Sequence, residues 1–143
     1  MSKKVEAAEF QYKVQIKEQY LDTFGHVNNA AYLTLFEEAR WDFITENGYG
    51  IKDIQKNKQG PVVLDVSIRF KRELKNREVI NIHSQTESLS GKIMKMNQKM
   101  INARGEIASE AHFTFGFMDM EKRKLVNPPA SWLKAVGVKE GLD

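Results

Sequence analysis

The stretch that decides the fold runs from residue 20 to residue 42 and reads YLDTFGHVNNAAYLTLFEEARWD. Its first half is polar, and its second half repeats apolar residues at the spacing of one helix face. Asn28 and Asn29 suit a helix start, because a side-chain oxygen there can accept an unpaired backbone N–H. Asn47 and Gly48 supply a stop. We therefore expect a helix over residues 29–47, whose buried face holds Tyr32, Leu35, Phe36, Ala39 and Phe43, with Leu33 and Ile44 at its margins.

Segments on both sides of this helix alternate apolar and polar residues, which is the pattern of half-buried strands. Residues 10–16, 62–70, 79–87, 93–103 and 107–118 are the predicted strands, with a turn over residues 88–91. Short connections favour antiparallel neighbours. The expected class is α+β, an antiparallel five-stranded sheet against one long helix. The strand that should cover the helix presents one apolar face made of Val62, Leu64, Val66, Ile68 and Phe70.

Two shorter helices are expected outside this core. Residues 51–56 predict a helical turn, and residues 128–137 predict a terminal helix with proline in its first turn and Gly137 after its end. Three Phe side chains share one face of the last strand, and three Met side chains with Gln98 share one face of the strand before it. Thioethers are flexible enough to line an acyl tunnel, but core packing is the commoner role of any single Met, and the two roles can coexist.

Length and composition limit the classes of function. A chain of 143 residues is the size of one domain, which we place at residues 1–143. With 22 Lys+Arg and 19 Asp+Glu, the formal charge is only +3, which does not favour a nucleic-acid partner. The absence of cysteine excludes disulfides and thiolate chemistry. No signal peptide or membrane-spanning run is visible, so a cytoplasmic location is expected.

The chemistry-bearing residues gather just before the predicted helix. Asp22 lies a few residues from a helix start whose free N–H groups can bind a developing oxyanion. A carboxylate beside an oxyanion site suits hydrolysis of an acyl bond, because one group activates water or attacks while the other stabilises the tetrahedral oxygen. These residue types also form ordinary turns and helix caps. Spacing alone leaves both interpretations open.

The motif Asp-x-x-Gly-His-Val-Asn-Asn-x-x-Tyr, followed by Phe-Glu-Glu-Ala-Arg-Trp, resembles the signature of hotdog-fold acyl-CoA thioesterases of the 4-hydroxybenzoyl-CoA thioesterase superfamily. It is similar above all to the bacterial long-chain acyl-CoA thioesterases. The motif residues are Asp22, Gly25, His26, Val27, Asn28, Asn29 and Tyr32, then residues 36–41. The resemblance implies a five-stranded sheet wrapped around one long helix, thioester hydrolysis without metal or organic cofactor, and homodimers or homotetramers with the site at a subunit boundary.

The resemblance also assigns roles. It implies that Asp22 is the general base or nucleophile, that His26 assists, and that N–H groups of Asn28, Asn29 and Ala30 receive the thioester oxygen. Lys71 and Arg72, in a basic turn, are candidates for binding the CoA phosphates; the alternative is a solvated hairpin end. The expected substrate is a medium- or long-chain fatty acyl-CoA. Aromatic acyl-CoA, a thioester of acyl carrier protein, and a non-catalytic acyl-CoA- or lipid-binding dimer are the alternatives.

Overall fold

The longest helix of the protein is α1, Asn29–Glu46, in a computed structural model that describes residues 3–139. Asn28 caps its start, because Asn28 Oδ1 accepts the Ala30 N–H at 2.9 Å. At the other end the Asn47 N–H still bonds to the Phe43 carbonyl, and Gly48 then takes a φ of 97° that reverses the chain. The predicted helix over residues 29–47 is confirmed.

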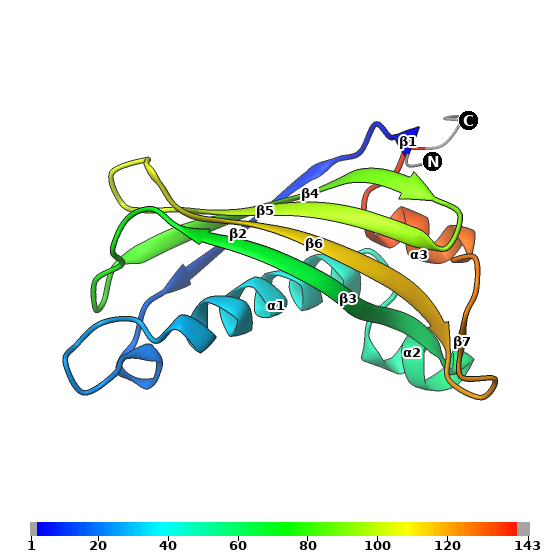
Figure 1. The fold of residues 1–143 in the computed structure, drawn as a ribbon, viewed down its shortest axis with the longest axis horizontal. Helices are drawn as coiled ribbons and strands as arrows, with labels where there is room; N and C mark the ends of the chain where they lie inside the picture. Colours follow the sequence, from blue (N-terminus) through cyan, green and yellow to red (C-terminus); the bar gives the residue numbers. More distant parts are fainter. Residues whose placement is uncertain (1–2, 140–143) are drawn as a thin grey trace.

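A strongly curved antiparallel sheet lies over α1 (Figure 1). Its long strands follow the order β2–β4–β5–β6–β3. Two short strands extend it, β1 beside β4 and β7 beside β6. The α+β class and the five-stranded antiparallel sheet are confirmed. The strand bounds are β1 Lys3–Lys4, β2 Glu9–Gln15, β3 Gln59–Phe70, β4 Val79–Ser90, β5 Ile93–Ile101, β6 Ile107–Asp119 and β7 Lys124–Leu125.

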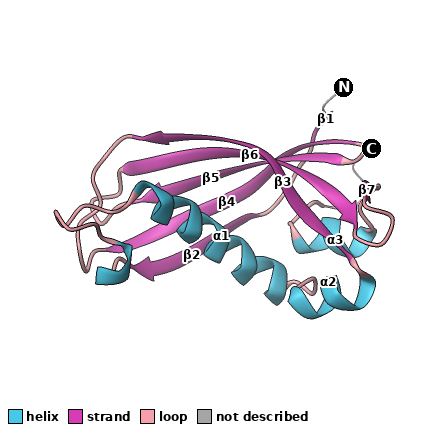
Figure 2. Cartoon of the chain, turned by 60° about the horizontal axis from the view of Figure 1, so that its bottom comes forward, coloured by secondary structure: helices cyan, strands magenta, loops and turns pink. Residues whose placement is uncertain are grey.

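The core lies between α1 and the concave face of the sheet, which Figure 2 shows from the helix side. The Phe36 ring packs edge-on against Phe113 with ring centroids 6.0 Å apart, and Phe43 stacks on Phe10 at 4.5 Å. Each such ring contributes about 1.5–3 kcal/mol by leaving water. The three Phe residues predicted on one face of β6 and the Met-rich face of β5 are all buried: Met94, Met96, Gln98, Met100, Phe113, Phe115 and Phe117.

Strand β3 differs from its prediction. Leu64 is the extra residue of a β-bulge, because Val63 pairs with Phe115 while Asp65 pairs with Thr114. Directly paired residues share a face, so Val63 and not Leu64 points to the helix side. The expectation that Val62, Leu64, Val66, Ile68 and Phe70 share one face is therefore wrong at its first two positions.

The bulge places Leu64 on the opposite face of the sheet. Its Cδ1 lies 3.2 Å from the point where a Cβ on Gly116 would stand, and Gly116 pairs with Val62. On the helix side, Val63 and Phe70 each remain 49% exposed. Among the strands that the structure describes, only β6 pairs with β3. Strand β3 is therefore an edge strand with a half-covered apolar face.

Two further details depart from expectation. Ser88, Leu89 and Ser90 continue β4 rather than forming a turn, because Leu89 packs against the core and pairs with Met94. Leu33, expected at the margin of the buried face of α1, is 39% exposed. The chain turns instead after Ser90, where Gly91 has a φ of 57°.

The short helices lie at both ends of α1: η1 Glu18–Tyr20 precedes its start, and α2 Ile51–Asn57 and α3 Ala130–Ala135 lie near its end. Trp132 of α3 packs against Tyr49 and Phe117, with ring centroids 5.6 Å from each, so α3 closes that end of the core. The predicted helices over residues 51–56 and 128–137 are thus present, the second shorter than expected. Across residues 3–139, no helix combines the length and apolarity needed to span a membrane.

Candidate active site

The loop from Leu21 to Val27 is a tight, hydrogen-bonded turn that leads into α1. Leu21 and Val27 form an isolated antiparallel bridge, and the Asp22 N–H donates to the His26 carbonyl at 2.8 Å. Gly25 closes the turn with a φ of 80°, a conformation that side chains with a Cβ rarely adopt. The backbone therefore fixes where Asp22 stands relative to the helix start.

The carboxylate of Asp22 is held by one of its two oxygens. Oδ1 accepts the N–H groups of Phe24 at 2.9 Å and His26 at 3.0 Å. The hydrogen bond from the His26 N–H is the main cause that holds the pKa of Asp22 below its usual range. Within residues 3–139, Oδ2 accepts no hydrogen bond. Asp22 thus presents an ionised, unoccupied oxygen near neutral pH, although the same bonds also describe a turn-forming aspartate.

At the helix start, two of the three expected oxyanion donors are already used. The Asn28 N–H donates to the Tyr20 carbonyl at 2.9 Å, and the Ala30 N–H donates to Asn28 Oδ1. The Asn29 N–H has no acceptor within residues 3–139. Because an unpaired N–H at a helix start attracts negative charge, Asn29 is the donor that this geometry leaves available.

The imidazole of His26 points toward the loop between β3 and β4. Its Nε2 lies 3.7 Å from Glu73 Oε1, and its side chain is 62% exposed. His26 meets Asp22 through its backbone N–H and not through its ring. The structure therefore brings Asp22, His26 and the helix start into one loop without joining the ring to the carboxylate.

A carboxylate that the sequence did not single out ties this loop to the helix. Glu38 of α1 accepts hydrogen bonds from Tyr12 of β2 at 2.7 Å and from Tyr20, just before the loop, at 3.3 Å. Burial, followed by the bond to Glu38, raises the pKa of Tyr12 to about 12. In the sequence Glu38 appears only within residues 36–41 of the motif. Its role could not be predicted from there, because its two partners come from other elements.

Lys71 and Arg72 lie at the same end of the molecule, where His26 meets Glu73. Both have acidic neighbours: Lys71 Nζ is 3.3 Å from Glu110, and Arg72 is 3.5 Å from Glu106. These are exposed pairs, which exchange readily with water and ions. A phosphate would have to compete with the two carboxylates. Within residues 3–139, no cluster of three His, Asp or Glu residues could hold a metal ion.

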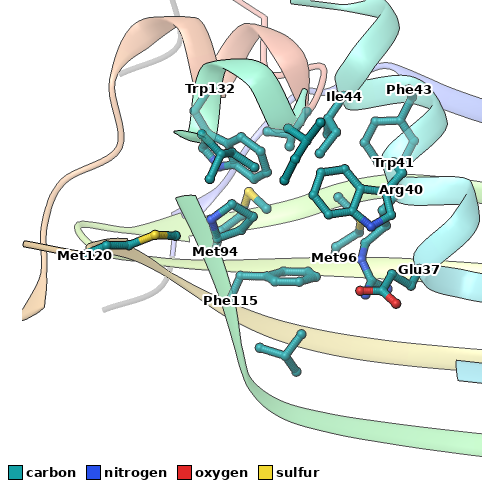
Figure 3. Close-up of a pocket in the computed structure, with 15 residues that line it drawn as sticks. Glu37, Arg40, Trp41, Phe43, Ile44, Met94, Met96, Phe115, Met120 and Trp132 are labelled. Carbon is teal, nitrogen blue, oxygen red and sulfur yellow. The ribbon is translucent and has the colours of Figure 1, made fainter. Parts of the chain in front are cut away.

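An apolar cavity of about 270 Å³ opens between the second half of α1 and the sheet (Figure 3). Met94 and Met96 of β5 line it, together with Phe115 and Trp132. Its polar side chains come from α1, chiefly Glu37 and Arg40. The Met face of β5 was the sequence signal for this cavity. Arg40 and Trp41 lay inside the quoted motif but carried no signal of their own.

The curved antiparallel sheet around one long helix, with Asp22 in the loop before the helix start, is the arrangement expected of a hotdog-fold thioesterase. The model of the thioesterase-like superfamily matches residues 14–136, and this chain belongs to that superfamily. Among curated proteins it is 30% identical to the long-chain acyl-CoA thioesterase FadM of Escherichia coli, over 80% of this chain and 86% of that one. The chain is accordingly a thioester hydrolase.

Solved structures agree on the fold. A Staphylococcus aureus protein determined in complex with CoA superposes with a TM-score of 0.84 at 15% identity, covering 91% of this chain and 82% of that one. The DHNA-CoA thioesterase of Staphylococcus aureus gives a TM-score of 0.77 at 20% identity, covering 83% of this chain and 80% of that one. The chain therefore shares its fold with a CoA-bound protein and with a thioesterase named for DHNA-CoA.

Proposed function

We propose that the protein hydrolyses fatty acyl-CoA to a free acid and CoA, with Asp22 as the reacting carboxylate. The observation that carries this proposal is the pairing of an ionised Asp22, with Oδ2 unoccupied, and the unused N–H of Asn29 across one rigid turn. The first supplies the base or nucleophile and the second stabilises the oxyanion. The identity to FadM, named for long-chain acyl-CoA, supports this substrate class.

Two routes use the same atoms. In the base route, Asp22 takes a proton from water, whose oxygen attacks the carbonyl carbon; the C–S bond then breaks and the thiolate is protonated. In the nucleophilic route, Asp22 attacks directly, releasing the thiolate and forming an acyl-aspartyl anhydride that water hydrolyses. Turnover in ¹⁸O water distinguishes them, because only the nucleophilic route can leave the label in the Asp22 carboxylate.

The apolar cavity supports a chain rather than a small aromatic ring as the acyl group. Glu37, the first residue of α1 in its lining, follows Asn29 by about 12 Å at 1.5 Å per residue. A thioester carbonyl at Asn29 would therefore need an acyl chain of at least medium length to reach the cavity. An aromatic acyl-CoA is the second candidate, because the DHNA-CoA thioesterase shares the fold.

Strand β3 supports a homodimer. It is an edge strand whose helix-side residues Val63, Val66 and Phe70 are each at least 36% exposed, so pairing with a second copy would cover them. Asp22, His26 and Asn29 are all exposed. Because excluding bulk water strengthens the electrostatic interactions of an active site, we propose that the second subunit completes the site.

The test is thiol release from acyl-CoAs of graded chain length and from an aromatic acyl-CoA, with the wild type, Asp22→Asn and Asp119→Asn. Asp119 is a matched control: its Oδ1 also accepts two backbone N–H bonds, from Glu121 at 3.0 Å and Lys122 at 2.9 Å, and its pKa is also lowered. We expect Asp22→Asn to reduce kcat on the order of 10²–10⁴-fold while Asp119→Asn leaves it unchanged. Equal activity of both variants would exclude Asp22 from the chemistry.

A further inference from the structure

Arg40 is a half-buried cation held against the core. Its guanidinium lies over the rings of Phe113 and Phe115, 4.4 and 5.2 Å from their centroids. Its Nη1 donates to Gln98 Oε1 at 2.9 Å. Gln98 is itself fully buried, and its Nε2 donates to the Phe36 carbonyl at 3.1 Å and to Ser84 Oγ at 2.8 Å. The position of the guanidinium is therefore set by α1, β4, β5 and β6 together.

The charge of Arg40 is not balanced by a neighbour. Among the described residues 3–139, no carboxylate forms an ion pair with it, although Glu37 lies on the same helix one turn earlier. Burial lowers its pKa to about 10, so Arg40 still carries its charge at neutral pH. A guanidinium has five N–H donors, and Gln98 takes one of them. A desolvated cation with spare donors favours an anion beside it.

The lining of the cavity limits which anion can bind beside Arg40. Arg40 lies among its lining residues with Glu37 and Trp41, on the side formed by α1 (Figure 3). Away from Arg40 the lining is apolar. It comes from Ile54 of α2, from Met120 just after β6, and from Trp132 of α3. A ligand that satisfies both regions has an acidic head and an unbranched apolar tail.

We propose that Arg40 and the cavity form a binding site for a carboxylate on an aliphatic chain, with the carboxylate on the guanidinium and the chain along the apolar surface beside it. Such a carboxylate has two sources: a free fatty acid, or the far end of an ω-carboxyacyl thioester. The second source rests on the proposed thioesterase function, whereas the first does not. A free fatty acid is the product of the proposed reaction, so its binding here would let accumulated product occupy the acyl cavity.

The first measurement compares binding of decanoate and 1-decanol to the unmodified protein by calorimetry. Equal chain length isolates the contribution of the carboxylate. We expect decanoate to bind at least about tenfold more tightly, because a charge-assisted pair in a desolvated site exceeds a neutral hydrogen bond. Equal binding would overturn the proposal, and it is the result expected if a carboxylate of a second copy already neutralises Arg40.

The second measurement repeats the comparison with Arg40→Met, Arg40→Lys and Arg104→Met. The methionine keeps much of the apolar stem, the lysine keeps the charge, and Arg104 is an exposed control in the turn between β5 and β6. We expect Arg40→Met to abolish the preference for decanoate with decanol binding retained, Arg40→Lys to keep part of it, and Arg104→Met to keep all of it. An unchanged preference in folded Arg40→Met would overturn the assignment.

Kinetic measurements distinguish the two sources of the carboxylate. If the carboxylate belongs to the substrate, an ω-carboxyacyl-CoA has a higher kcat/KM than the unsubstituted acyl-CoA of equal length, and Arg40→Met removes the difference. If it belongs to the product, decanoate inhibits competitively and the ω-carboxyl gives no advantage. A protein that binds decanoate through Arg40 but releases no thiol from any thioester would refute the proposed function and leave this site standing.

Discussion

Tyr12 and Glu38 are joined by a 2.7 Å hydrogen bond, donated by the Tyr12 hydroxyl to Glu38 Oε2, that ties strand β2 to helix α1. The other carboxylate oxygen accepts from Tyr20, whose carbonyl in turn accepts the Asn28 N–H. One side chain of α1 therefore holds the entrance of the Asp22 loop against the helix that the loop precedes. This relationship predicts that loop geometry, and with it catalysis, depends on a residue remote from the reacting atoms.

Replacing Glu38 by alanine should lower both stability and turnover. Two hydroxyl donors lose their acceptor, at a cost of about 1–3 kcal/mol in the free energy of unfolding. We expect kcat to fall more than KM rises, because Asp22 is misplaced rather than removed. Urea unfolding and thiol release measure the two effects. Glu37→Ala, an exposed neighbour on the same helix, should change stability by less than about 0.5 kcal/mol.

The ion pair of Glu18 and Arg77 predicts a pH-dependent contribution to stability. Hydrogen bonds from Arg77 lower the pKa of Glu18 from 4.5 to about 2. Because the pKa is lower in the folded state, the contribution is complete above pH 4.5 and is lost as the pH falls toward 2. The Tm difference between the wild type and Arg77→Met should shrink over this interval. Arg104→Met is the control for loss of a surface arginine. A Tm difference between the wild type and Arg77→Met that stays constant from pH 6 to pH 3 would contradict the assignment.

A charge in the middle of β3 should separate the proposed dimer. Val66 is 36% exposed on the helix side of this edge strand, and lysine there would be buried without a partner on pairing. We expect Val66→Lys to be monomeric by analytical ultracentrifugation and to lose most thioesterase activity. Val79→Lys is the control, because Val79 is 53% exposed at the start of β4, away from β3. A monomeric wild type with full activity would refute the shared site.

Narrowing the cavity at its outer end should shorten the preferred acyl chain. Met120 lines the cavity and is 45% exposed, so a Met120→Trp side chain can fill space there without disrupting packed neighbours. We expect kcat/KM to fall for long acyl-CoAs and to hold for short ones, as a chain-length panel would measure. Leu64→Trp, on the opposite face of β3, should leave the profile unchanged. A uniform loss across chain lengths would place the acyl chain elsewhere.

Local sequence patterns predicted most of the fold. The cap at Asn28, the stop at Asn47 and Gly48, and the alternation in the later strands act over a few residues, so each could be read without its partners. The Asp22 turn was predictable for the same reason, since the hydrogen bonds to the Asp22 carboxylate come from residues at most four positions away. The catalytic role of Asp22 stays a prediction.

The sequence by itself thus determined the long helix, the strand order along the chain and the acidic turn before Asn29. Only the tertiary structure decided which side chains meet across elements. The bulge at Leu64 was invisible because Val62, Val63 and Leu64 are all apolar, and register is set by the partner strand. Arg40 reads as one more helix residue. Its position against Phe113 and its hydrogen bond to Gln98 depend on residues distant in the chain, so only the tertiary structure shows that its charge is partly buried.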